Sequence, residues 1–168
     1  MHTLITGVAG SGKTTIAAEL EQRNHTVCET DSVAGLCFWA TIATGEPVPN
    51  FKRETIPDWA KQYGWFWNEK TLTALLNEKP DAFFCGSANN QEKFYHMFDK
   101  IYLLKMDPPL IQARVRGDSR KHNYGKLPGD IAAILSYYED FQNKAIAAGA
   151  TIIDARKPVA AIVSTILS

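Results

Sequence analysis

The sequence predicts a three-layer α/β fold in which helices cover both faces of a five-stranded parallel sheet. Short apolar and β-branched runs alternate with helix-compatible segments along the chain, which is typical of such a sheet. A glycine-rich segment at 7–12 joins the first apolar run to the first helical one. The 168 residues, of which 45% are hydrophobic and 21% charged, have the size and composition of one globular domain.

The expected strands are short apolar runs bounded by turn residues. They lie at 3–6, 26–31, 81–86, 100–106 and 150–153. The expected helices have apolar residues every three to four positions or begin at a proline that suits a first turn. They begin near residues 13, 91, 108, 130 and 158. The chain is therefore expected to form a single domain, 1–168, with no linker that would divide it.

A helical insertion is expected at about 33–78, on the substrate side of this domain. Residues 33–45 are mainly apolar and helix-compatible, and a helix is also expected at 68–78. Between them, residues 58–67 form the densest aromatic stretch of the chain. These rings either stack on a ligand or form the core of the insertion, with Trp65 and Trp67 the better candidates for ligand contact.

Residues 7–14 match the pattern G-x-x-x-x-G-K-[ST] between an expected strand and an expected helix. The glycines let backbone N–H groups approach phosphate oxygens, and the helix N-terminus faces the same anion. Lys13 is expected to reach the β- and γ-phosphates of ATP, and the Thr14 hydroxyl is expected to ligate Mg²⁺. The expected nucleotide-binding residues here are Gly7, Ala9, Gly10, Ser11, Gly12, Lys13, Thr14 and Thr15.

Two acidic residues, Glu29 and Asp31, lie near the end of the second expected strand, on the same side of it. Ligands of open α/β sheets bind beyond the carboxyl ends of the strands, so both acids are expected to face the phosphates. The alternative is that Asp31 caps a helix beginning near Ser32. Polar residues at 87–90 follow the third strand at the same edge, where they bond a substrate or cap the next helix.

Five cations lie between residues 114 and 126, in a segment with two glycines and little apolar content. Arg114, Arg116 and Arg120 suit a lid at about 112–127 that closes over the γ-phosphate. Arginine forks there would stabilise the charge that develops during phosphoryl transfer. The alternative is a solvated run of charges.

The composition also limits the partners and the compartment. Basic and acidic residues number 18 each, so no nucleic-acid or membrane partner is expected. No apolar run approaches the roughly 20 residues that cross a bilayer, and the first expected strand leaves no room for a signal peptide. The three cysteines show no C-x-x-C spacing. We expect a cytoplasmic monomer or homodimer without a cysteine-bound metal.

The order of these motifs resembles the small P-loop kinases, which include adenylate, shikimate and gluconate kinases and their nucleoside-kinase relatives. The shared motifs are the loop at 7–14, the acids at 29 and 31, the Arg-rich segment 114–120 and residues 153–159. The resemblance implies a P-loop NTPase fold with an Arg-rich lid, in which Glu29 helps to hold Mg²⁺ and Asp31 orients the acceptor hydroxyl. It also implies an adenine site lined by Asp154, Ala155, Arg156 and Pro158.

Two differences from the family's sequence pattern restrict the chemical class of the expected phosphoryl acceptor. Residues 86–90 lack the glycine triplet of shikimate kinases, and Arg53 is the only arginine in 46–70, where nucleoside-monophosphate kinases hold the acceptor phosphate. The sequence therefore predicts a small-molecule kinase that transfers the γ-phosphoryl group of ATP to a hydroxyl of a small metabolite. Apolar or aromatic acceptors, nucleosides among them, fit best. The alternatives are a P-loop nucleotide hydrolase, for which the NKxD-type motif is missing, and a non-catalytic ATP-binding protein.

Overall fold

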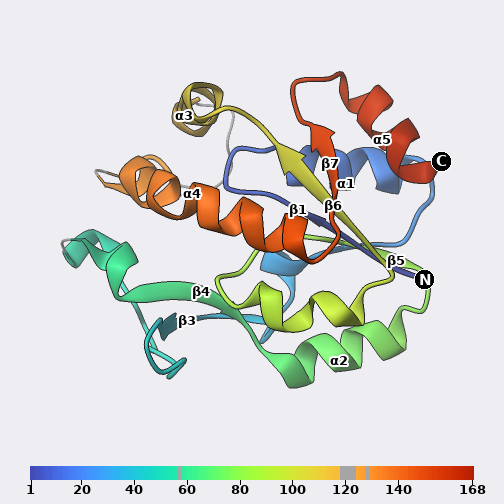
Figure 1. Cartoon of the computed structure of the whole chain (residues 1–168). Helices are drawn as coiled ribbons and strands as arrows, with labels where there is room; N and C mark the ends of the chain where they lie inside the picture. Colours follow the sequence, from blue (N-terminus) through green and yellow to red (C-terminus); the bar gives the residue numbers. More distant parts are fainter. Residues whose placement is uncertain (57, 118–123, 128) are drawn as a thin grey trace.

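In a computed structural model, which describes residues 1–56, 58–117, 124–127 and 129–168, five parallel strands form the central sheet (Figure 1). Their order across the sheet is β2-β5-β1-β6-β7, and every neighbouring pair is parallel. The strands are β1 His2–Thr6, β2 Val27–Glu29, β5 Ala82–Cys85, β6 Lys100–Lys105 and β7 Thr151–Asp154. The predicted five-stranded parallel sheet is confirmed.

Helices cover both faces of this sheet, as the sequence predicts. Successive residues of β1 show why: Leu4 packs into one buried cluster with α2 (Glu69–Glu78), and Ile5 packs into the other with α1 (Lys13–Gln22) and α5 (Val159–Leu167). The 3₁₀ helix η4 (Gln91–Met97) covers the same face as α2, and α4 (Asp130–Ala147) packs across β6 and against α3 (Pro108–Arg116). The result is the three-layer α/β arrangement.

The expected helix at 33–45 is wrong. Residues Cys37–Thr41 form β3, which pairs antiparallel with β4 (Tyr63–Trp67), with Trp39 opposite Trp65. Aromatic and β-branched side chains favour strands, and cross-strand ring pairs stabilise them, but the partner strand is too distant in sequence to show in local periodicity. The insertion is therefore a two-stranded sheet followed by α2, the part of it predicted correctly.

Two asparagines dock β4 onto the loop that follows β5. The side-chain oxygen of Asn89 accepts a hydrogen bond from the Trp65 backbone N–H at 2.7 Å. The backbone N–H of Asn89 donates to the Trp65 carbonyl, also at 2.7 Å. The side-chain amide of Asn90 makes both bonds to Trp67: its oxygen accepts from the backbone N–H at 2.8 Å, and its nitrogen donates to the carbonyl at 2.9 Å. Neither side chain caps η4. The two amides fix the insertion to the carboxyl edge of the main sheet.

A buried carboxylate ties the insertion to the start of α4. Asp130 is fully buried and accepts from Arg53 Nε at 3.2 Å, where Arg53 lies in the 3₁₀ turn η2 (Arg53–Thr55). The same carboxylate accepts from the N–H groups of Gly125 and Leu127 at 2.7 and 3.2 Å. One side chain therefore joins the insertion, the segment before α4, and α4 itself.

We predict that Asp130→Ala lowers the free energy of unfolding by about 3–5 kcal/mol, because it removes the acceptor from a buried cation and two backbone N–H groups. Urea unfolding followed by circular dichroism measures this change. The matched control is Asp140→Ala on the same helix, where an exposed pair with Lys144 should contribute less than about 1 kcal/mol. Equal losses in the two variants would contradict a structural role for the buried carboxylate.

Among the described residues, no helix is both long and apolar enough to span a membrane. The three cysteines are free thiols, of which Cys28 and Cys85 are buried.

Candidate active site

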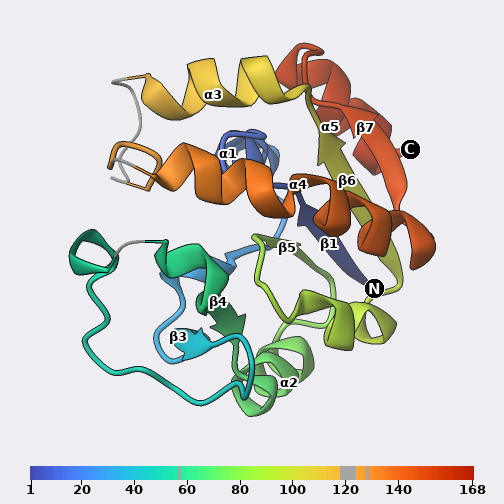
Figure 2. The ribbon, with the colours of Figure 1, turned by 60° about the vertical axis from the view of Figure 1, so that its left-hand side comes forward.

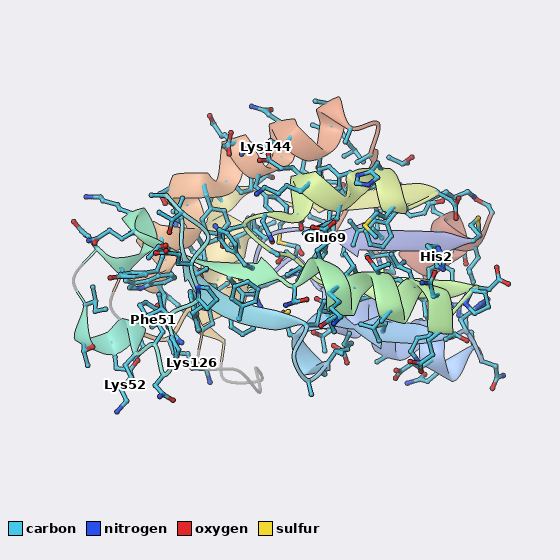
Figure 3. All side chains as sticks on the ribbon, turned by 90° about the horizontal axis from the view of Figure 1, so that it is seen from below. His2, Phe51, Lys52, Glu69, Lys126 and Lys144 are labelled. Atoms are coloured by element: carbon cyan, nitrogen blue, oxygen red, sulfur yellow. The ribbon has the colours of Figure 1, made fainter. Side chains whose placement is uncertain are left out.

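A cavity of about 1170 Å³ lies at the carboxyl edge of the parallel sheet. Its walls come from the loop before α1, the β3–β4 sheet, the loop after β5, α3, α4 and the loop before α5. In Figure 2, α3 lies above α4, and β3 and β4 lie below it. Phe51, Lys52 and Lys126 lie at one end of the molecule in Figure 3, and His2 lies at the other.

The loop at 7–14 has the geometry of a phosphate-binding loop. Gly10 and Gly12 have φ angles of +88° and +100°, a region that favours glycine, and a Cβ on Gly10 would lie 2.8 Å from a Val115 methyl. No side chain caps α1, which begins at Lys13, so its first N–H groups remain available to an anion. Lys13 Nζ donates to the carbonyls of Gly7 and Val8 at 2.6 and 3.2 Å.

Seven of the eight predicted loop residues line the cavity. These are Ala9, Gly10, Ser11, Gly12, Lys13, Thr14 and Thr15. Gly7 is buried beneath them, where a Cβ would lie 2.6 Å from Ser11 Oγ and 2.8 Å from the Leu104 carbonyl oxygen. The absence of a Cβ at this position lets the loop pack closely against β6.

Asp31 lines the cavity, but not for the predicted reason. β2 ends at Glu29, and Asp31 lies on the 3₁₀ turn η1 (Thr30–Ser32), so strand alternation does not relate the two acids. In the described chain no helix begins at Ser32, because η1 ends there and β3 is the next element. The predicted alternative, a helix capped by Asp31, is therefore wrong. Glu29 is not among the described residues that line the cavity, so the structure does not bring it to the predicted metal site.

The Asp31 carboxylate is held at one oxygen only. Oδ1 accepts from Trp65 Nε1 at 3.0 Å and, more weakly, from Cys37 Sγ at 3.8 Å. Burial and the nearby Asp31 charge raise the pKa of the Cys37 thiol to about 12, which keeps this thiol a neutral donor. Oδ2 accepts no hydrogen bond from the described residues. It is therefore available to a ligand hydroxyl in the cavity.

Of the three predicted lid arginines, Arg114 lines the cavity and donates to the Ala155 carbonyl at 3.2 Å. Arg116 is exposed on α3 and is not among the described lining residues. Arg120 lies outside the described residues, as do the other residues of the predicted lid between 118 and 123. The described start of that segment, up to Arg116, is the end of α3, and Gly117 lines the cavity beyond it.

The predicted adenine site is only partly at the cavity. Ala155 lines it, together with Lys157, Val159 and Ile162, which the sequence did not single out for this role. Asp154, Arg156 and Pro158 are not among the described lining residues.

Asp154 and Arg156 bind each other instead. Arg156 donates to both carboxylate oxygens of Asp154 at 2.8 Å and reaches Asp107 at 3.4 Å. These hydrogen bonds lower the pKa of Asp154 to about 2. The pair lies on the exposed side of the loop between β7 and α5, and the residues of 153–159 that line the cavity are Ala155, Lys157 and Val159.

An aromatic wall, formed by Trp39, Trp59, Tyr63 and Trp65, lines the half of the cavity made by the insertion. The ring centroid of Trp39 lies 5.4 Å from that of Trp59 and 5.2 Å from that of Trp65. The structure separates the two candidates for ligand contact: Trp65 lines the cavity, whereas Trp67 is 1% exposed and packs in the core.

Three further rings line the cavity, from the chain before and within α4. They are Tyr124, Tyr137 and Phe141. Tyr124 lies 6.0 Å from Trp59 between ring centroids. The sequence singled out the aromatic stretch at 58–67 but not Trp39 or Tyr124, whose proximity depends on the β3–β4 pairing and on the Arg53–Asp130 contact.

Solved structures share this fold over nearly the whole chain. Deoxyadenosine kinase from M. mycoides with bound dATP has a TM-score of 0.62 and 14% identity, covering 99% of this chain and 97% of that one. Shikimate kinase from Acinetobacter baumannii in complex with shikimate has a TM-score of 0.61 and 16% identity, covering 99% and 90%. A gluconokinase from Sinorhizobium meliloti 1021 has a TM-score of 0.54 and 15% identity, covering 97% and 87%.

No protein-family model matches the sequence, and no curated protein matches it. The structural neighbours are small P-loop kinases, so the predicted fold and the resemblance are confirmed at the level of the fold.

Proposed function

We propose that this chain is an ATP-dependent kinase that phosphorylates a hydroxyl group of a small metabolite. The observation that carries the proposal is that one cavity is lined by a phosphate-binding loop and by a carboxylate with an unoccupied oxygen, Asp31 Oδ2. Aromatic side chains line the same cavity beyond Asp31, which gives it room for an acceptor larger than water. The fold, shared with small-molecule kinases, supports the same reaction class.

ATP would bind with its phosphates on the loop N–H groups and Lys13, and with its base against Ala155, Val159 and Ile162. The donor set suits Mg²⁺, a hard cation that is bound by few protein oxygens and keeps several waters. Thr14 lines the cavity, and its hydroxyl would hold the ion together with phosphate oxygens; Glu29 is not among the described lining residues. The ion, when bound, neutralises charge on the phosphates.

The acceptor hydroxyl would donate its hydrogen bond to Asp31 Oδ2, which orients the oxygen toward the γ-phosphorus. As the new oxygen–phosphorus bond forms, the bond to the bridging oxygen of ADP breaks, and the hydroxyl proton passes to the Asp31 carboxylate. Lys13 and Arg114, both at the cavity, would stabilise the negative charge on the transferring group. A closed lid over 112–127 would exclude water as a competing acceptor.

We test this function by measuring ATP consumption by the purified protein with and without a panel of hydroxyl-bearing metabolites. The proposal expects slow basal turnover that at least one metabolite accelerates, with ADP and a phosphorylated metabolite in equal amounts. Rapid turnover that no metabolite changes would indicate a hydrolase. ATP binding without any turnover would indicate a binding protein.

We predict that Trp65→Phe lowers kcat by about tenfold and leaves ATP affinity unchanged, because it keeps the ring but removes the hydrogen bond that orients Asp31. Steady-state kinetics and ATP titration separate the two effects. The matched control is Trp59→Phe, since Trp59 lines the same cavity but its indole nitrogen donates to no described residue. A similar kcat in both variants would assign Trp65 to packing alone.

A further inference from the structure

We propose that the phosphoryl acceptor is an uncharged molecule in which a flat, unsaturated ring carries the hydroxyl-bearing part, as in a nucleoside. This inference rests on the kinase function proposed above. It follows from three features of the acceptor half of the cavity: its rings, its charges and the polar groups at its edge.

The rings place an apolar, flat surface directly beside the reacting hydroxyl. Trp65 contributes its ring to the cavity wall, and its Nε1 bonds Asp31 at 3.0 Å. A ring stacked on Trp65 would therefore hold the group that it carries close to Asp31 Oδ2. Stacking on indole favours flat, unsaturated rings over saturated ones, because the whole face of a flat ring lies against the face of the indole.

The charges disfavour an anionic acceptor. Four described cations line the cavity, and Lys13, Arg114 and Lys157 belong to its nucleotide half. The fourth, Arg53, lies on the insertion, but its charge is matched by the fully buried Asp130, and its guanidinium lies 5.3 Å from the Tyr124 ring centroid. Among the described residues, Asp31 therefore leaves this half of the cavity with a negative charge. A carboxylate or phosphate on the acceptor would be repelled there.

The packing of the rings disfavours an ammonium group. An aromatic cage encloses a cation between rings that stand on either side of it. Here the rings touch one another: Trp39 lies 4.7 Å from Phe51, 5.2 Å from Trp65 and 5.4 Å from Trp59 between centroids. In each of these pairs the two rings are in direct contact, so a cation does not fit between them.

Two polar groups at the edge of the wall suit a ring that carries hydrogen-bond acceptors. Asn89 uses Oδ1 to accept from the Trp65 N–H, which assigns its amide nitrogen as a donor. That nitrogen and the Ser87 hydroxyl bond no described residue, and both side chains line the cavity. A ring with nitrogen or carbonyl acceptors, or a sugar hydroxyl, would satisfy them.

The test compares five sets of acceptors with ATP and Mg²⁺ on the full chain: neutral nucleosides, their 5′-monophosphates, the acids shikimate and gluconate, ring-free polyols, and choline and ethanolamine. We expect only the nucleosides to accelerate ADP formation, about tenfold or more over the basal rate, and to quench tryptophan fluorescence. Acceleration by any other set without the nucleosides would overturn the inference and leave the kinase function standing. No transfer to any acceptor would overturn the kinase function itself.

A pair of variants separates the ring from its hydrogen bond. Relative to Trp65→Phe, Trp65→Leu should raise KM for the accepted nucleoside about tenfold and change KM for ATP little, because only leucine removes the stacking surface. Equal KM values for the nucleoside would overturn the role of the ring. Should Trp65→Leu fail to fold by circular dichroism, Tyr63→Leu, two positions earlier on β4, is compared with Tyr63→Phe in the same assay, with the same expectation.

Discussion

Replacing Lys13 by alanine is expected to reduce kcat by about three orders of magnitude, because the charge that builds on the transferring phosphoryl group loses its nearest cation on the loop. The side chain lies on the loop itself, with Nζ bonded to the carbonyls of Gly7 and Val8, so the cation is held at the position where phosphate would bind. ATP affinity should fall by much less, since the backbone N–H groups remain. Pre-steady-state transfer and ATP titration measure the two effects.

The control for this variant is Lys61→Ala, which removes an exposed lysine that pairs only with Asp58 on the surface. Its kcat should equal that of the unmodified protein. Near-normal turnover in Lys13→Ala would show that the loop does not take part in the chemistry, whatever it binds.

Asp31→Asn is expected to lower kcat by about 10²- to 10⁴-fold with little change in ATP affinity. The amide keeps the shape of the side chain, and its oxygen still accepts from Trp65 Nε1, so the wall stays in place. What it loses is the charged oxygen that orients the acceptor hydroxyl and takes its proton. Single-turnover transfer at saturating ATP measures the chemical step directly.

The matched control here is Glu29→Gln, which neutralises the other predicted acid. Glu29 does not line the described cavity, so this change should reduce kcat by less than about threefold. A large, Mg²⁺-dependent loss in Glu29→Gln would restore the metal role that the resemblance implies. Equal losses of kcat and ATP affinity in Asp31→Asn would instead place Asp31 at the nucleotide.

The nucleotide half could be predicted because its signals are local. Each strand of the main sheet is a short apolar run, and the order strand, glycine-rich turn, helix at 3–22 lies within one continuous segment. The apolar residues at helical spacing on the first helix, Ile16, Ala17 and Leu20, are buried in the structure. On the last helix Ile162, Val163 and Ile166 are buried, and Val159 is partly buried.

The acceptor half could not be predicted in the same way, because it is built from contacts between distant segments. Trp39 becomes part of the wall only when β3 pairs with β4, and Arg53 meets Asp130, which lies 77 residues later in the chain. The position of Asp31 differs from the prediction because β2 is shorter than expected. The strand ends at Glu29, so the alternation of side chains along a strand does not extend to Asp31. Sequence patterns of period two or 3.6 carry no information on any of these contacts.

The central claim is that the loop at 7–14 and Asp31 act on the two ends of one phosphoryl transfer. The most direct measurement follows the label of γ-labelled ATP in the presence of Mg²⁺ and a nucleoside mixture. The account predicts that the label moves to an organic phosphate, that Asp31→Asn slows this movement, and that ADP appears in step with it. Label that appears only as inorganic phosphate, or that never leaves ATP, would contradict it.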